Sequence, residues 1–400
     1  MGGEGEPIAG GRVAPAGHVA LAAAVIGPWA LRAALPRVLG EAPEAKGAGA
    51  SELEALAATL PWALPLIGTS ALTVYCGSKR SVWDAEEEEA PEAITTSEAV
   101  KFPFVGSAVL FSLFLCFKFL PKEWINTVLA IYFVVLGVAA ITSVLYPFVE
   151  PVLPEWLASK EATLKVPSLP YVNEGGFSQV LDGTSLLLGT LSSAFCLYYY
   201  FSRHWLANNI LGVCFAIEGI EMIPLGSVKN GCILLVGLFF YDIFWVFCTP
   251  VMVTVAKSFD APIKLLFPRL YYGYPPEGEA LFSMLGLGDI VLPGLFVALM
   301  YRYDLAHAGS GGYFKVAMVS YGSGLAITLV VMTVFQAAQP ALLWIVPSVL
   351  GAVLGAAAVR GELKEVFNWE EEGLPEDGEE EGEEGPAGGD GDGEEAKKDK

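Results

Sequence analysis

Apolar stretches of about 20 residues recur along this 400-residue chain. They lie near 57–78, 102–120, 125–146, 183–202, 205–225, 231–256, 282–302, 313–336 and 341–360. A helix needs about 20 mostly apolar residues to cross a bilayer, and continuous apolar runs of this length exclude a transmembrane β-barrel. The chain is therefore expected to be an all-α polytopic membrane protein with about nine transmembrane helices.

The composition supports a membrane protein, because 54% of the residues are apolar and only 17% are charged. In soluble domains about 45–50% of the residues are apolar and about 25% are charged. The net charge of -21 comes largely from residues 370–395 and 84–92, which hold 20 of the 44 acidic residues. Such acidic runs are expected to be solvated and disordered. The remaining chain is close to neutral, so a nucleic-acid partner is not expected.

Three regions follow from this pattern. Residues 1–55 form an N-terminal extension, 56–365 a multi-span membrane domain, and 366–400 an acidic, disordered cytosolic tail. An alanine-rich apolar stretch at 17–35 is ambiguous between a signal sequence, an extra span and a surface helix. With the C-terminus in the cytosol, nine alternating spans place ten loop Lys and Arg on the cytosolic side and six opposite. This bias agrees with the positive-inside rule.

Two acidic residues stand out because they lie near the middle of predicted spans. Asp242 lies within 231–256 and Asp289 within 282–302. A charged group at that depth costs at least about 2.5–3.5 kcal/mol, so it is a functional candidate. Neither has a basic residue within two helical turns along the chain. The alternative is that each carboxyl only hydrogen-bonds a neighbouring helix.

Two carboxyl groups brought together in a low dielectric cannot both ionise, so the pair shares a proton. That protonation state suits hydrolysis. The ionised partner accepts a proton from water while the protonated partner polarises the scissile carbonyl. The chemistry therefore favours pairing of Asp242 with Asp289.

Small residues and a proline accompany the aspartates. Gly286 and Gly288 precede Asp289 and either make room for an extended peptide or form a packing face for another helix. Gln339-Pro340-Ala341-Leu342-Leu343 begins the last predicted span. The proline either initiates that helix or forms a tight turn beside the aspartates.

Other polar groups carry weaker signals. Glu218 and Glu221 share one helical face and either form a second acidic site or, close to Pro224 and Gly226, face water. The six cysteines form no CxxC pair and are expected to be buried free thiols. No metal site and no cofactor are predicted.

Three motifs follow one another at the predicted spans: Tyr241-Asp242, Gly286-Leu287-Gly288-Asp289 and Pro340-Ala341-Leu342. Together they resemble the signal peptide peptidase and presenilin families of intramembrane aspartyl proteases. The stretches 204–209, 231–235 and 256–264 are similar to signal peptide peptidases in particular. The resemblance covers about 100–365, and residues 1–55 depart from it.

The resemblance implies a nine-span fold with a lumenal N-terminus and a cytosolic C-terminus. It implies that Asp242 and Asp289 are the catalytic residues of an intramembrane aspartic endopeptidase. The residues expected to shape its site are Tyr241, Gly286, Leu287, Gly288, Pro340, Ala341 and Leu342. The expected substrates are membrane-inserted, type II-oriented helices such as signal peptide remnants.

Other functions stay open on the sequence. Carboxylates at mid-membrane depth also serve transporters and channels, and a non-catalytic scaffold could bind signal-like helices. The C-terminal Lys397-Lys398-Asp399-Lys400 resembles a dilysine retrieval signal, which predicts residence in the endoplasmic reticulum membrane. The natural substrates and the oligomeric state, a homo-oligomer included, are left undecided.

Overall fold

The computed structural model describes residues 52–82, 92–158, 162–166, 177–259, 261–268, 282–307, 312–335 and 339–371. The apolar stretch at 17–35, most of the acidic tail and the C-terminal lysines lie outside these residues.

Long helices account for most of the described chain. Each of the nine predicted stretches coincides with a helix of at least 17 residues. These are α2 (Glu52–Arg80), α3 (Thr96–Phe119), α4 (Lys122–Val149), α6 (Gly183–Ser202), α7 (Trp205–Glu221), α8 (Val228–Phe247), α10 (Gly288–Ala306), α11 (Tyr313–Phe335) and α12 (Leu342–Arg360). Shorter helices are η1 (Glu150–Val152), α5 (Glu155–Ala158), α9 (Val251–Ser258) and α13 (Leu363–Phe367).

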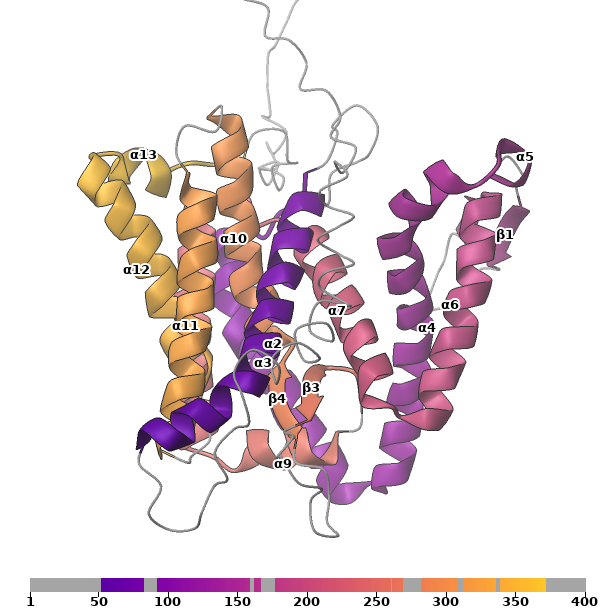
Figure 1. Ribbon diagram of the computed structural model, residues 1–400, viewed down its shortest axis with the longest axis horizontal. Helices are drawn as coiled ribbons and strands as arrows, with labels where there is room; N and C mark the ends of the chain where they lie inside the picture. Colours follow the sequence, from indigo (N-terminus) through magenta and orange to yellow (C-terminus); the bar gives the residue numbers. More distant parts are fainter. Residues whose placement is uncertain are drawn as a thin grey trace, which may run out of the picture.

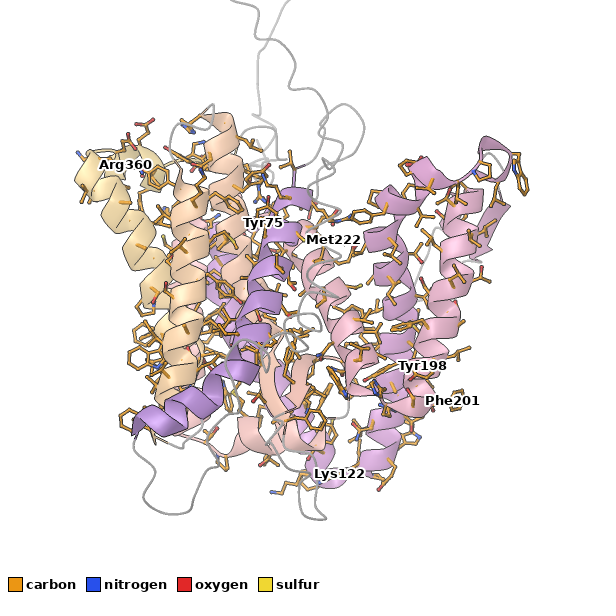
Figure 2. The ribbon with its side chains drawn as sticks, in the orientation of Figure 1. Tyr75, Lys122, Tyr198, Phe201, Met222 and Arg360 are labelled. Atoms are coloured by element: carbon orange, nitrogen blue, oxygen red, sulfur yellow. The ribbon has the colours of Figure 1, made fainter. Side chains whose placement is uncertain are left out.

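Within the part of the chain that the structure describes, five helical segments are long and apolar enough to cross a membrane: 96–119, 122–152, 228–247, 313–335 and 342–360. The prediction of a helical polytopic membrane protein is confirmed, while the number nine stays a prediction. Lys122 and Arg360 lie at opposite ends of the bundle (Figure 2). Tyr198 and Phe201 point outward from α6, and their exposed fractions are 54% and 79%. Outward aromatic groups on a helix are what a surface facing lipid requires.

The bundle has two distinct ends (Figure 1). α13 lies at one end, and α9 lies at the other together with strands β3 (Lys264–Pro268) and β4 (Phe282–Gly286). α4 and α6 pack against each other on one side, and α4 also contacts α7. A second strand pair, β1 (Ala162–Val166) and β2 (Phe177–Leu181), precedes α6.

The strands correct the prediction that 282–302 is one helix. Residues 282–286 instead pair antiparallel with β3, from Lys264 opposite Gly286 to Pro268 opposite Phe282. α10 begins only at Gly288. Gly286 and Gly288 are poor helix formers, so the helix starts after the first of them. Asp289 therefore lies in the first helical turn and not in the middle of a helix.

The predicted span 231–256 is also divided. α8 ends at Phe247, and α9 starts at Val251 after Pro250. Pro250 has no N–H to donate and its ring crowds the preceding turn, which favours a break in the helix at this position. Asp242 consequently lies in the C-terminal half of α8.

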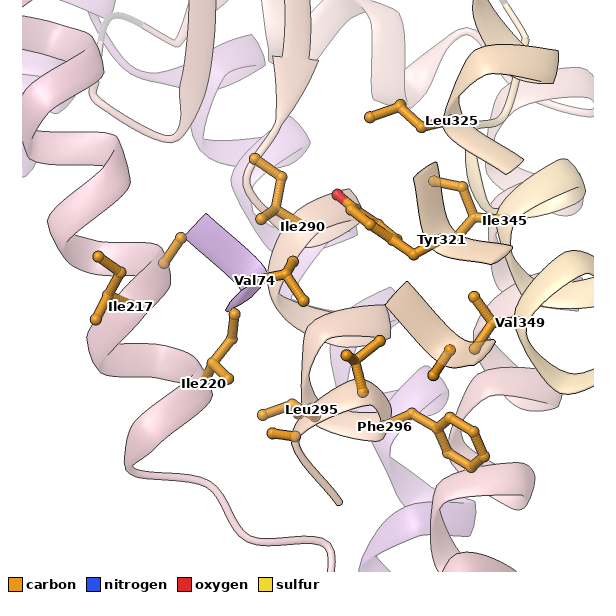
Figure 3. Close-up of a cluster of buried hydrophobic side chains, with 14 of the residues drawn as sticks. Val74, Ile217, Ile220, Ile290, Leu295, Phe296, Tyr321, Leu325, Ile345 and Val349 are labelled. Carbon is orange, nitrogen blue, oxygen red and sulfur yellow. The ribbon is translucent and has the colours of Figure 1, made fainter. Parts of the chain in front are cut away.

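Helices α2, α7 and α10 cross closely where Ile220 of α7 lies beside Val74 of α2 and Leu295 of α10 (Figure 3). The approach depends on glycines. A Cβ added to Gly77 would lie 2.8 Å from Cβ of Ile220, and one added to Gly294 would lie 2.6 Å from Cδ1 of Ile220. These contacts fix α10, which carries Asp289, against the centre of the bundle.

We expect Gly77→Ala to lower the free energy of unfolding by about 1–3 kcal/mol, because the added methyl overpacks a rigid contact. Gly68→Ala on the same helix is the matched control, since a Cβ there meets nothing within 4 Å. That control should stabilise by about 0.5–1 kcal/mol through helix propensity. Thermal unfolding in detergent compares the two, and equal shifts would show that the crossing tolerates a side chain.

Glu218 and Glu221 were predicted to face water, and the structure contradicts this. Arg80 at the end of α2 forms an ion pair with Glu221, with Nε 2.6 Å from Oε2, and its Nη2 lies 3.9 Å from Oε1 of Glu218. The side chains of the two acids are only 18% and 21% exposed. The nearby base, distant in sequence, explains why acids are tolerated there.

The packed chain extends past the boundary expected at 366. We refer to residues 363–371 as the C-terminal clasp. Val366 is fully buried, and the backbone of Trp369 and Glu371 bonds to Val228 and Gly226 at the start of α8. Glu371 also forms an ion pair with Arg302 of α10. The clasp thus joins the two helices that carry the aspartates.

All six cysteines are free, as predicted. Cys76, Cys196, Cys214 and Cys232 are buried, whereas Cys116 is partly exposed and Cys248 is exposed. The expectation of burial is therefore wrong for Cys248, which follows the last residue of α8.

Candidate active site

Asp242 is buried, with 3% of its surface exposed, and it contacts the start of another helix. Its Oδ2 accepts a hydrogen bond from the backbone N–H of Leu342 at 3.1 Å. Leu342 is the first residue of α12, so its N–H has no partner within that helix. A helix N-terminus favours negative charge, which makes this a suitable place for a carboxylate.

Asp289 is partly exposed and lies in the first turn of α10. Its carboxyl group faces the backbone amide of Gly286 at the end of β4. A Cβ on Gly286 would lie 3.3 Å from Oδ2 of Asp289, tighter than an ordinary van der Waals contact. Glycine at this position therefore lets the strand approach the carboxyl group closely.

Asp242 and Asp289 lie on α8 and α10, two helices that pack against each other. Each also lies at the N-terminus of a helix, Asp242 at that of α12 and Asp289 at that of its own α10. Two helix N-termini favour negative charge at the pair, and mutual repulsion disfavours a second charge. The arrangement suits one proton and one negative charge shared between two carboxyl groups.

The Pro340-Ala341-Leu342 segment serves both roles left open by the sequence. Pro340 is buried and its carbonyl accepts from Leu343 N–H at 3.3 Å, which begins α12. The Ala341 carbonyl accepts from the Thr328 hydroxyl of α11 at 3.4 Å. The turn is therefore tied to α11 on one side and to Asp242 on the other.

Tyr241, Leu287 and Gly288 each make contacts of their own. The Tyr241 ring lies 3.7 Å from where a Cβ on Gly106 of α3 would be, and so packs beside that helix. Leu287 donates its N–H to the Ile263 carbonyl at 2.9 Å. Gly288 is exposed, and a Cβ there would meet only Leu292 of its own helix, at 3.8 Å. Among the described residues Gly288 therefore does not form a packing face for another helix.

One residue at the site was missed by the sequence reasoning. Tyr321 of α11 is fully buried, and its hydroxyl lies 3.5 Å from the Asp289 carbonyl oxygen. Figure 3 shows the hydroxyl directed toward Ile290 at the start of α10. The available signal was a hydroxyl-bearing ring inside an apolar stretch, which usually needs a hydrogen-bond partner.

The described residues contain no group of three or more His, Cys, Asp or Glu side chains arranged to hold a metal ion.

Comparison with known proteins shows the family of the chain. A family model described as signal peptide peptidase matches residues 86–373. The signal peptide peptidases of Mus musculus and Homo sapiens are each 41% identical over 305 residues, covering 75% of this chain and 80% and 81% of theirs. Intramembrane protease 2 of Caenorhabditis elegans is 47% identical over 203 residues, 48% of this chain and 43% of that protein. The chain belongs to the signal peptide peptidase family of multi-pass intramembrane proteases.

Proposed function

We propose that the chain is an aspartic endopeptidase that cleaves helices within the bilayer, with Asp242 and Asp289 as its catalytic pair. The observation that carries this proposal is the position of the two carboxyl groups. The helices that carry them, α8 and α10, pack against each other, and each carboxyl group lies at a helix N-terminus. Family membership agrees with proteolysis, and the pair supplies the means for it.

In the proposed reaction, the ionised carboxyl takes a proton from a water molecule while the oxygen of that water attacks the peptide carbonyl carbon. The protonated carboxyl donates its proton to the carbonyl oxygen. Collapse of the tetrahedral intermediate breaks the C–N bond. The carboxyl that took the water proton gives it to the leaving nitrogen, and the other carboxyl takes a proton from a hydroxyl of the intermediate, so the pair again holds one proton. Because the pair titrates as a unit, neither carboxyl has a fixed role at the start.

The proposed substrates are membrane-inserted, type II-oriented helices such as signal peptide remnants. A helix hides its carbonyl groups within its own hydrogen bonds, so a segment must unwind before water can attack. The partly exposed Asp289 and the exposed Gly288 leave the pair accessible to such a segment. The proposed orientation has a lumenal N-terminus and a cytosolic C-terminus.

The test is incubation of the purified protein with a signal-peptide-like helix, with products identified by mass spectrometry. A matched peptide series of constant hydrophobicity should be cut faster where Gly or Pro lies near the bond, because unwinding then costs less. Binding without cleavage would instead indicate a scaffold, and solute flux in proteoliposomes would indicate a transporter. Equal rates across the series would contradict the requirement for unwinding.

The hydrogen bond from Leu342 to Asp242 gives a prediction of its own. Leu342→Pro removes the N–H that donates to Asp242, and its ring also disfavours the helical backbone of Ala341 before it. We expect cleavage to fall by about 10- to 150-fold, since a hydrogen bond to a charged group contributes about 1.5–3 kcal/mol. The measurement is kcat/KM on the peptide helix.

Two variants control for this change. Leu342→Ala keeps the N–H and tests the loss of the side chain alone. Leu343→Pro places the same ring one residue later and removes only the turn bond to Pro340. If either control loses as much activity as Leu342→Pro, the hydrogen bond to Asp242 is not what matters.

We further propose residence in the endoplasmic reticulum membrane, from the lysines near the C-terminus. Changing Lys397 and Lys398 to Ser should let part of the protein reach later compartments, because a retrieval receptor reads such lysines as an address. Cleavage in detergent should not change. Fluorescence imaging of the tagged variant measures its location. An unchanged reticular pattern would show that another part of the chain retains the protein in the endoplasmic reticulum.

A further inference from the structure

Two asparagines at the start of α7, Asn208 and Asn209, take no part in the proposed chemistry. They are buried, 4% and 7% exposed, in an apolar bundle. A buried amide must find partners or destabilise the protein. Both of these side chains find them on the backbone of β3.

Asn209 bonds twice to one residue of the strand. Its Nδ2 donates to the Leu266 carbonyl at 2.8 Å, and its Oδ1 accepts from the Leu266 N–H at 2.7 Å. This pair of bonds is what a neighbouring strand would supply at that residue. The amide thus satisfies an edge of β3 that the β4 ladder leaves unpaired.

Asn208 extends the contact toward Asp289. Its Nδ2 donates to the Lys264 carbonyl at 2.7 Å, and its Oδ1 accepts from the Tyr199 hydroxyl at 3.3 Å. Lys264 lies opposite Gly286 in the strand pair. The amide therefore holds the end of the hairpin that faces the catalytic pair.

One turn further along α7, Gly212 completes the contact. A Cβ there would lie 3.1 Å from Leu265 Cδ2 and 3.4 Å from Leu287 Cδ2. Leu265 is the middle of the segment that the asparagines hold, and Leu287 lies between β4 and Asp289. One face of α7 therefore contacts both β3 and Leu287, which lies two residues before Asp289.

We infer that Asn209, assisted by Asn208, is a positioning residue that docks the β3–β4 hairpin on α7 and thereby holds Asp289 opposite Asp242. The inference rests on the proposed catalytic role of the two aspartates. It assigns the function of Asn209 to placement of a reacting group and not to general stability. The position requires one donor and one acceptor a short side chain away, which asparagine supplies.

The test compares Asn209→Leu and Asn209→Asp with the unchanged protein on one peptide helix. Asn209→Leu removes both bonds, and kcat should fall about tenfold or more, since a misplacement of about 1 Å can cost on the order of 100-fold. KM should change little. The products should also spread over neighbouring peptide bonds, because a displaced Asp289 no longer selects one carbonyl.

Asn209→Asp adds a second measurement, the pH dependence of the cleavage rate, which a purely structural role would not change. An ionised aspartate keeps the acceptor for Leu266 N–H but cannot donate to the Leu266 carbonyl, whereas a protonated one can. Its rate relative to the unchanged protein should therefore rise as the pH falls. A ratio that is the same at every pH would overturn the inference.

Asn230 offers a matched control. It is also 7% exposed, and its Nδ2 donates to the carbonyls of Ile94 and Leu225, away from the hairpin. Asn230→Leu should lower thermal stability about as much as Asn209→Leu while leaving a single cut site. If the two variants lose kcat equally with one cut site each, Asn209 is only structural. If the unchanged protein cleaves nothing, the proposed function fails instead.

Discussion

Replacing either Asp242 or Asp289 with asparagine should lower cleavage of a helical peptide by at least about 10²–10⁴-fold, the usual contribution of general acid–base catalysis. Asparagine keeps the size of the side chain and an acceptor for Leu342 N–H. It cannot hold the shared proton or the negative charge. The measurement is the rate of product formation by mass spectrometry, with membrane insertion of each variant checked in parallel.

Asp304 on α10 is the matched control for these substitutions. It is 9% exposed, and its two oxygens accept from the backbone N–H groups of Tyr313 and Phe314 at 3.0 and 2.9 Å. Asp304→Asn should lower stability by about 1–3 kcal/mol by leaving one N–H poorly satisfied, yet retain most cleavage. A single Asp242→Asn or Asp289→Asn variant that cuts at a near wild-type rate would refute the pair.

The same protonation argument concerns the pH dependence of the unchanged protein. One carboxyl must be neutral and the other ionised, so the rate should rise and then fall with pH as the pair titrates. A hydroxyl-bearing mimic of the tetrahedral intermediate should compete with the substrate. A rate that stays flat well into alkaline pH would be inconsistent with a shared proton.

The sequence identified Asp242 and Asp289 as candidate residues because an acid in an apolar stretch is costly wherever the surrounding helices lie. It also predicted that the Pro340-Ala341-Leu342 segment matters, and this segment indeed contacts Asp242. It did not predict that Asp289 begins a helix. The residues before it are apolar enough for a span, and only pairing with β3 makes them a strand.

The contacts of Asn209 and Arg80 could not be predicted from the sequence, because both depend on the three-dimensional arrangement of the helices. Asn209 bonds to the backbone of Leu266, which any residue type would offer. Arg80 is 141 residues from Glu221, so helical spacing could not suggest that pair. Both depend on which helices become neighbours, and apolar periodicity does not specify that arrangement.

The C-terminal clasp leads to the largest expected effect on stability. Arg302 of α10 forms two hydrogen bonds with the carboxylate of Glu371, and its Nη1 donates to the Ser81 hydroxyl at 2.7 Å. The side chains of the pair are only 8% and 10% exposed. A buried charge deprived of its partner destabilises a protein by about 3–5 kcal/mol. Glu371→Gln and Arg302→Met should each lower the unfolding temperature in detergent strongly.

Two comparisons separate this effect from a general sensitivity of the clasp. The double variant Arg302→Met with Glu371→Met should be less destabilised than either single variant, because no unpaired charge stays buried. Glu365→Gln changes a 64% exposed side chain 3.9 Å from His307 and should shift stability by less than about 1 kcal/mol. The clasp joins the start of α8 to the end of α10, so cleavage in the single variants should decline as the helices that carry Asp242 and Asp289 separate. Full stability in Glu371→Gln would show that the ion pair contributes nothing to holding these two helices.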